Sequence, residues 1–349
     1  MPRAALAECA VRARLAGSKV VRFFTVIGLV AATLFPNEMA ASTIRVEVTA
    51  QPIMNFKVGS AQKHFGKLEF MGGLLMKSPE PLFGAISSIR FLPDGQSFLA
   101  VLDTGHWMSG TLERGATGAL SGLSNVSIDA MLDRNGQAAK RKVDMDAEGL
   151  ALRGAQAFVS YEQQPRIDIY PYENRTTAKP VGHLPHLIPD SEFRRNAGME
   201  TLALSPADGP LKGAMVTVAE ASLDRSGNLF AAVLEGPRKG LFAVAKDASF
   251  SVTDGAFLPD GDLLLLERRF NFAEGIGMRI RRIKADAIRP GAVVDGDILL
   301  EADLSYQIDN MEGLDVVKAP DGSLRLILVS DDNHSFLQRN VMLEFKLTE

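Results

Sequence analysis

Cysteine is almost absent from this chain of 349 residues: the only one is Cys9, close to the amino terminus. Without further thiols the chain has no disulfide staples, no thiolate metal site and no cysteine nucleophile. The sequence also contains no Gly-x-Ser-x-Gly elbow, no Gly-x-x-x-x-Gly-Lys phosphate loop and no His-Glu-x-x-His motif. These absences exclude thiol, P-loop and zinc-protease chemistry. A serine nucleophile at Ser87 or Ser88 stays open, although nothing in the sequence fixes a histidine beside either.

Long hydrophobic runs are missing as well. The longest, Phe23 to Phe35, has 13 residues, which is short for a membrane span. Basic residues precede it, and Pro36 and the small residues Ala40 and Ala41 follow, which is the order of a secretory signal. We therefore predict a signal peptide over residues 1–41, cleaved near Ala41, and a periplasmic or secreted protein without a membrane span in its mature part. The alternative is an uncleaved amino-terminal anchor.

Acidic residues outnumber basic ones in the remaining chain. Removing residues 1–41 takes away five basic and two acidic side chains, so the net charge changes from −4 to −7. This balance argues against nucleic acid as a partner and favours bound cations.

What the sequence does contain is a pattern that recurs five times: a polar turn, a short apolar run, a second turn and a longer apolar run that ends on a carboxylate. The units begin at Ser87, Glu148, Glu200, Asp254 and Glu312, with spacings of 61, 52, 54 and 58 residues. A period near 50 built from short strands is typical of propeller blades with about four strands each. We therefore predict an all-β fold in which residues 42–349 form a single β-propeller.

The blade count follows less directly from the pattern. Five units are visible, and a sixth could come from residues 43–76 or from residues 228–245, so we predict six blades, with five to seven open. Pro-Asp-Gly and similar turns between the runs indicate hairpins. Ile44 to Val48 alternates like a strand, and we expect it beside Val341 to Leu347 because propeller termini often share a blade.

Carboxylates at the unit starts should surround one end of the central channel, because they immediately precede the innermost strands. Like charges held close raise one another's pKa unless a cation joins them, and oxygen ligands suit Ca²⁺ above all. We predict a calcium site built from Glu148, Glu200, Glu312 and the strand-ending Asp331. The competing interpretation is that each carboxylate caps a turn or accepts backbone N–H groups between blades.

Departures from the repeat are more informative than the repeat itself. Asp331-Asp-Asn-His334 extends the last unit and His106 follows the first, so His106, Asp332 and His334 are the acid–base candidates. A histidine beside a tryptophan, as at His106, is also typical of a packing pair. Arg268 is a candidate for binding an anionic substrate group, and a solvated turn charge is the alternative.

Several of these segments resemble the phytase-like family, also described by an esterase-like activity of phytase. The resemblance spans roughly residues 84–349 and is carried by Glu148-Gly-Leu-Ala-Leu152, Glu200-Thr-Leu-Ala-Leu204, Leu263-Leu-Leu-Leu-Glu-Arg268, and Asn310-Met-Glu-Gly-Leu314 with Leu328-Val-Ser-Asp-Asp-Asn333. The chain lacks the Asp-Ala-Asp-Pro and Asn-Asn-Phe-Asp motifs of the calcium-dependent propeller phytases.

The resemblance implies an exported bacterial propeller that hydrolyses phosphoester or carboxylester bonds of a small anionic molecule. On such a scaffold Ca²⁺ would neutralise the substrate and activate a water. The main alternative is a non-catalytic binding or scaffold propeller, and a structural envelope protein is a third, since fold does not establish function. The sequence does not indicate an oligomeric state.

Overall fold

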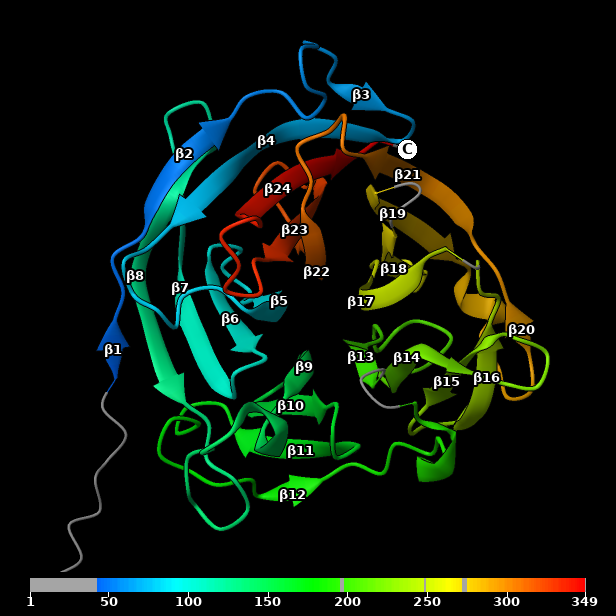
Figure 1. Ribbon diagram of the computed structural model, residues 1–349. Helices are drawn as coiled ribbons and strands as arrows, with labels where there is room; N and C mark the ends of the chain where they lie inside the picture. The colour runs from blue at the N-terminus through cyan, green and yellow to red at the C-terminus, as the bar shows by residue number, and fades with distance from the viewer. Residues whose placement is uncertain (1–42, 195–197, 248, 272–274, 349) are drawn as a thin grey trace, which may run out of the picture. The chain divides into compact units, whose positions relative to one another are not determined.

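Five β-sheets stand around a central channel in the computed structural model (Figure 1). The structure describes residues 43–194, 198–247, 249–271 and 275–348; the predicted signal peptide lies outside them. Each innermost strand contacts the innermost strands of both neighbouring blades, so the ring is closed. The prediction of an all-β single propeller is confirmed, and the prediction of six blades is wrong, because five sheets complete the ring.

From the channel outward, the strands of each blade are ordered as follows. The first blade contains β5 (Ile86–Phe91), β6 (Ser97–Leu102), β7 (His106–Arg114), β8 (Leu120–Ala130) and β1 (Ile44–Arg45). The second contains β9 (Ala147–Arg153), β10 (Gln156–Tyr161), β11 (Arg166–Pro171) and β12 (Gly182–His183). The third contains β13 (Met199–Leu204), β14 (Met215–Leu223), β15 (Leu229–Val233), β16 (Gly240–Val244) and β20 (Val293–Val294). The fourth contains β17 (Ser251–Phe257), β18 (Leu263–Asn271), β19 (Gly275–Ile283) and β21 (Asp297–Asp303).

The fifth blade combines strands from near both ends of the described chain. It contains β22 (Asn310–Lys318), β23 (Leu324–Asp331), β24 (Asn340–Leu347), β4 (Leu68–Lys77) and β2 (Thr49–Ile53), and β3 (His64–Phe65) pairs with β4. The only helices in the described residues are three short 3-10 turns: η1 (Lys142–Asp144), η2 (Asp190–Glu192) and η3 (Ala285–Ala287). None of the described helices is long and apolar enough to cross a bilayer.

Both candidates for a sixth blade are instead outer strands of existing blades. Each repeated unit supplies only the two inner strands of a blade, which leaves an unpaired edge that later or earlier segments must cover. Residues 229–244 become β15 and β16 of the third blade, and residues 49–77 become β2 and β4 of the fifth. The leftover strands therefore complete blades that the repeat begins.

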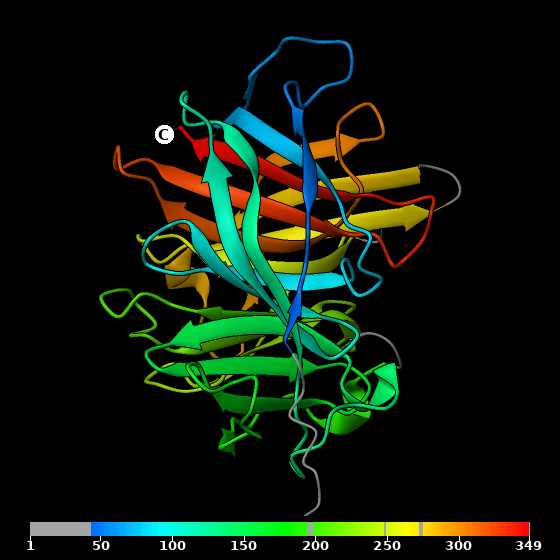
Figure 2. The same cartoon turned by 90° about the vertical axis from the view of Figure 1, so that its left-hand side faces the viewer.

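The amino-terminal strand does not pair where it was expected. β1 pairs with β8 of the first blade, with Ile44 opposite Ile128. The strand beside the carboxy-terminal β24 is β4, with Leu347 opposite Leu68. The chain then passes from β1 along the outside to β2 of the fifth blade, so this segment links the first and last blades (Figure 2).

Tight turns connect the two inner strands of several blades, as their sequences predict. Gly95, Gly261 and Gly322 have φ of 69°, 93° and 81°, a region that favours glycine. In the first of these turns Asp94 accepts hydrogen bonds from the backbone N–H groups of Gln96 and Ser97, at 2.9 and 2.8 Å.

A single arginine ties the innermost strands together inside the channel. Arg90 of β5 donates to the backbone carbonyls of Leu314, Leu202 and Gly255, which belong to three other innermost strands, at 2.9, 3.1 and 3.1 Å. Its guanidinium also forms a bidentate pair with the buried carboxylate of Asp254 at 2.8 Å. These bonds satisfy backbone carbonyl groups of three innermost strands. Apolar side chains fill the spaces between the blades.

Candidate functional site

One extra residue interrupts the pairing of every innermost strand with its neighbour. Such a bulge bends the strand and turns the bulged side chain in a new direction, and bulges are common beside active sites. Reading the pairing registers, the extra residues are Ser87, Glu148, Glu200, Thr253 and Glu312. Four of the five predicted unit starts are therefore bulge residues at one end of the channel.

The fourth unit is shifted by one residue from the predicted repeat. Its bulge residue is Thr253, whereas Asp254 points to Arg90 and accepts hydrogen bonds from Ser88 Oγ and the backbone of Leu314, both at 3.0 Å. The expectation that Asp254 lies with the other unit-start carboxylates at this end of the channel is thus corrected. The segment Phe-Leu-Pro-Asp-Gly occurs at residues 91–95 and again at residues 257–261. Ser87 stands four residues before the first copy and Thr253 four residues before the second, so the alignment of the two copies reveals this shift.

The same shift changes the set of carboxylates on which the longer apolar runs of the sequence end, which are Asp103, Glu162, Glu220, Glu267 and Asp331. In each blade one residue of the second strand pairs with the residue just before the bulge. The residues that follow it are Asp103, Glu162, Glu220, Arg268 and Asp331, so the fourth blade presents an arginine. Glu267, which the repeat placed in this set, is buried and paired with Arg279 at 2.5 Å and with Arg281. It stabilises the fourth blade.

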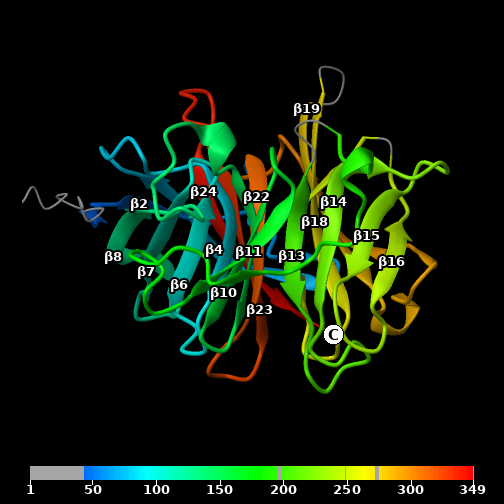
Figure 3. The same cartoon turned by 90° about the horizontal axis from the view of Figure 1, so that it is seen from below.

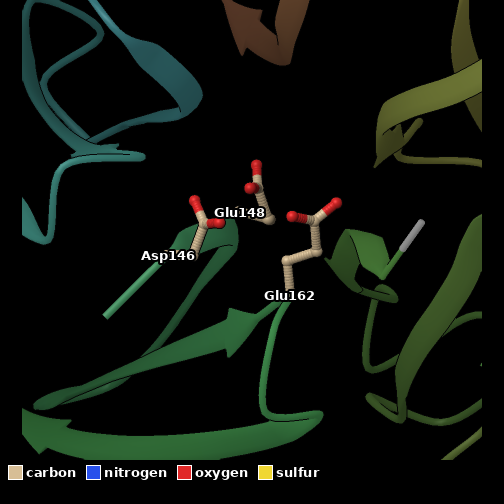
Figure 4. Close-up of side chains that lie close together, drawn as sticks. All are labelled: Asp146, Glu148 and Glu162. Atoms are coloured by element: carbon tan, nitrogen blue, oxygen red, sulfur yellow. The ribbon is translucent and has the colours of Figure 1, made fainter. Parts of the chain in front are cut away.

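Five carboxylates of the second and third blades converge at this end of the channel. One oxygen each of Asp146, Glu148 and Glu162 lies within 4.8 Å of the others, and the same holds for Glu162, Glu200 and Glu220. We call these five residues the carboxylate cluster; Figure 4 shows the first three, with Glu148 projecting from β9 and Glu162 from the end of β10. Glu162 belongs to both groups, so it lies at the centre of the cluster.

Asp146 is the member that sequence reasoning missed. It stands two residues before a bulge glutamate, in Asp146-Ala-Glu148, which matches Asn310-Met-Glu312 in the last unit. In the structure Asn310 donates a hydrogen bond to Glu312 Oε1 at 2.8 Å. A polar residue therefore stands two positions before the bulge glutamate in both blades. That match is the signal that could have identified Asp146.

Burial and mutual repulsion shape the ionisation of these groups. The pKa of Glu162 is raised to about 7, mainly by burial and next by the charge of Asp146. Burial and the charges of neighbouring carboxylates also raise the pKa of Glu148 and of Glu200 well above the usual range. The charge of Glu312 contributes to both of these shifts, so Glu148, Glu200 and Glu312 lie close enough to influence one another.

Two cations flank the carboxylate cluster. Arg268 Nη2 lies 3.3 Å from Glu220 Oε1, and its Nε lies 3.2 Å from Glu312 Oε1. Lys142 pairs with Asp103, and its Nζ lies 3.6 Å from Asp146 Oδ1. The predicted ligand Glu312 is therefore in contact with the predicted substrate residue Arg268.

The remaining site predictions are placed around this centre. Asp331 is buried and accepts the backbone N–H of Asn333 at 2.7 Å, and burial raises its pKa to about 7. Asp332 stabilises the turn that follows β23. It accepts hydrogen bonds from Asn340 Nδ2 at 2.8 Å and from the backbone N–H of His334 at 3.1 Å.

The two histidine candidates belong to different blades. The His334 side chain is exposed on the β23–β24 connection, where its residue has a φ of 49°. His106 belongs to β7 of the first blade, where its Nδ1 lies 3.1 Å from Thr104 Oγ1. Burial lowers its pKa. The structure thus brings the glutamates and Arg268 together but does not join the histidines into a pair.

The donor set of the carboxylate cluster fits a hard cation. Every member offers carboxylate oxygens, which are the ligands that Ca²⁺ prefers. Within the described residues, the Oδ1 atom of Asp146 is buried and accepts no hydrogen bond, because Lys142 Nζ lies 3.6 Å away, beyond hydrogen-bond distance. A buried acceptor without a donor is costly, and a cation at this position would satisfy it.

Comparison with known proteins identifies the family. No curated protein matches the chain. Among solved structures, the β-propeller domain of Cps50 (Swd1) from Myceliophteria thermophila aligns at 14% identity and a TM-score of 0.33, covering 75% of this chain and 72% of that one. The family model described as "Phytase-like: Esterase-like activity of phytase" matches residues 81–334, which is more than half of the chain. The chain therefore belongs to the phytase-like family, whose described activity is that of an esterase-like hydrolase.

Proposed function

We propose that this protein is a metal-assisted hydrolase that cleaves phosphoester or carboxylester bonds of a small anionic substrate. The observation that carries the proposal is the position of Glu162, whose carboxylate belongs to two groups of three oxygen donors at the channel end. Such a concentration of carboxylates repels an anionic substrate, so a substrate of this charge requires a cation at the cluster.

Ca²⁺ is the proposed ion, held by Glu148 and Glu200 together with Asp146, Glu162 and Glu220. When bound, it would supply charge neutralisation of the substrate oxygens and a bound water of lowered pKa. Glu312 and Asp331, which the sequence also suggested as ligands, lie outside the two groups of three. Their part in the proposal is electrostatic: Glu312 holds Arg268 at the edge of the cluster.

Arg268 orients the substrate in this proposal. Its guanidinium bonds Asn310 Oδ1 at 3.0 Å as well as the two glutamates, so its position is determined by three partners from two other blades. A guanidinium held in this way can receive an anionic oxygen with little further ordering. Asp332 and His334 are proposed to transfer protons as the catalytic acid and base, with His106 as the alternative. Export through the amino-terminal signal remains part of the proposal.

The decisive experiment combines metal content with activity. The mature chain is purified, its bound metal is quantified, and hydrolysis of p-nitrophenyl phosphate and p-nitrophenyl acetate is measured with EGTA and after return of Ca²⁺ or Mg²⁺. We expect activity that EGTA removes and Ca²⁺ restores. Glu162→Gln should lower both metal content and activity, whereas Glu301→Gln, which removes an exposed glutamate of β21, should change neither. Absence of chelator-sensitive activity on both substrates would favour the non-catalytic binding propeller.

A further inference from the structure

A cavity of about 400 Å³ lies beside the carboxylate cluster, between the fourth and fifth blades. Its apolar wall includes Phe270, Ile276 and Leu337, and its polar wall includes Arg268 and Asn310. The volume falls in the range of small-molecule sites, which are typically apolar with a few converging polar groups.

The cavity and the carboxylate cluster share a wall. Arg268 lines the cavity, and the same guanidinium lies 3.3 Å from Glu220, a member of the cluster. Asn310 also lines the cavity and binds both Arg268 and Glu312. A ligand in the cavity is therefore separated from the cluster by the arginine that we propose to orient the substrate.

The apolar wall is unusually exposed for side chains of its kind. Phe270 is 72% exposed and Leu337 is 77% exposed. They belong to the β18–β19 hairpin and the β23–β24 connection, which project on the same side of the ring (Figure 3). Phe270 is paired across the hairpin with Ile276, so this side of the wall is built on regular sheet structure. Exposed apolar side chains that converge on a cavity indicate a ligand surface.

We propose that this cavity is the subsite for the apolar group of the substrate, so that the preferred substrates are esters with an aliphatic acyl chain of several carbons. This inference rests on the proposed hydrolase function. In the reaction, water adds to the acyl carbon and the acyl C–O bond breaks, which gives a carboxylic acid and an alcohol. The acyl chain lies against Phe270 and Leu337, and its ester carbonyl lies next to Arg268. Burial of each additional methylene favours binding.

Two measurements test this subsite separately from the hydrolase. The first compares kcat/KM for p-nitrophenyl hexanoate and p-nitrophenyl acetate in the Ca²⁺-loaded protein. The second measures binding of hexanoate and acetate by titration calorimetry, which needs no turnover. Leu337→Ser and Phe270→Ser remove apolar surface from two sides of the cavity. Phe336→Ser is the matched control, because Phe336 is 95% exposed and adjacent to Leu337 but does not line the cavity.

We expect the kcat/KM of the wild-type protein to be about tenfold higher for p-nitrophenyl hexanoate than for p-nitrophenyl acetate. Leu337→Ser and Phe270→Ser should each reduce that ratio by about threefold, and Phe336→Ser should leave it unchanged. Equal kcat/KM values for the two esters would overturn the proposed subsite but would leave the proposed hydrolase function standing. Hexanoate binding that Leu337→Ser weakens, without turnover of either ester, would support the subsite and overturn the hydrolase. No preference in either measurement would overturn the subsite.

Discussion

Arg268 Nε lies 3.2 Å from Glu312 Oε1, although the repeat pattern would place a carboxylate where Arg268 stands. The charge of Glu312 is the largest influence on the pKa of Arg268 and raises it. This pair joins the fourth and fifth blades at the channel end, next to the carboxylate cluster and to the apolar cavity. The exception in the repeat is thus the residue on which the proposed chemistry depends most.

Replacing Arg268 should impair catalysis. Arg268→Gln removes the charge that meets the substrate, and we expect kcat to fall by about 10²-fold, the usual cost of losing one electrostatic donor. Arg268→Lys should recover only part of the rate because an ammonium group cannot bind in bidentate fashion. Arg289→Gln, at an exposed position, is the control. A wild-type kcat and KM in Arg268→Gln would remove this residue from the proposed site.

Calcium should stabilise the folded protein. A ligand that binds only the folded state at about 100 times its Kd adds about 2.7 kcal/mol. We therefore expect Ca²⁺ to raise the melting temperature in differential scanning calorimetry. Glu162→Gln should lose most of this response, because its carboxylate belongs to both groups of donors, and Glu301→Gln should retain it. An equal response in all three proteins would place calcium elsewhere.

Stability without metal should fall as the pH rises from about 5 to about 8. The pKa of Glu162 and of Asp331 is raised to about 7, and that of Glu312 to about 8, in each case mainly by burial. Since the unfolded chain releases these protons at lower pH than the folded chain, the stabilising contribution is complete below the unfolded pKa and is lost as the pH passes the folded pKa.

This dependence can be measured from thermal melts in EGTA across the same pH range. Asp331→Asn should make the decline shallower because one titrating group is removed, while the exposed Asp297→Asn should follow the wild type. Addition of Ca²⁺ should also flatten the decline, since a cation favours the ionised carboxylates. Melting temperatures that rise between pH 5 and pH 8 in EGTA would contradict the assignment.

Breaking the pair between Arg90 and Asp254 should destabilise the ring. Both side chains are buried, and removing one partner from a buried ion pair costs about 3–5 kcal/mol. Asp254→Ala should therefore lower the free energy of unfolding by that amount in urea denaturation, whereas Asp297→Ala, at an exposed position, should have little effect. The calcium response of the folded Asp254→Ala protein should persist, because Asp254 faces Arg90; its loss would return Asp254 to the metal site.

The extension of the last unit should matter for turnover. His334 is flanked by Asn333 and Ser335, which line the cavity beside Arg268. If it transfers a proton, His334→Ala lowers kcat by about 10²-fold or more, and we expect this loss without a change in melting temperature. His183→Ala, an exposed histidine of the second blade, is the control. An unchanged kcat in His334→Ala would limit residues 332–334 to a role in the turn.

Much of the fold could be predicted because it is encoded locally. The five recurring units and their glycine turns specify hairpins, and each unit indeed forms the two inner strands of one blade. Glu148, Glu200 and Glu312 follow from the same repetition, since equivalent positions of equivalent blades lie at one end of the channel. The acidic character of that end was therefore visible in the sequence.

Tertiary structure alone decided which strands complete the blades and which side chains share the site. Strand pairing between residues 68–77 and 340–347 joins opposite ends of the chain, and no local pattern specifies it. The choice of Arg268 rather than Glu267 depends on a bulge that shifts the register by one residue, and in a strand such a shift turns a side chain to the opposite face. Arg90 reaches three other blades only because the ring closes, so its role too arises from packing of distant segments.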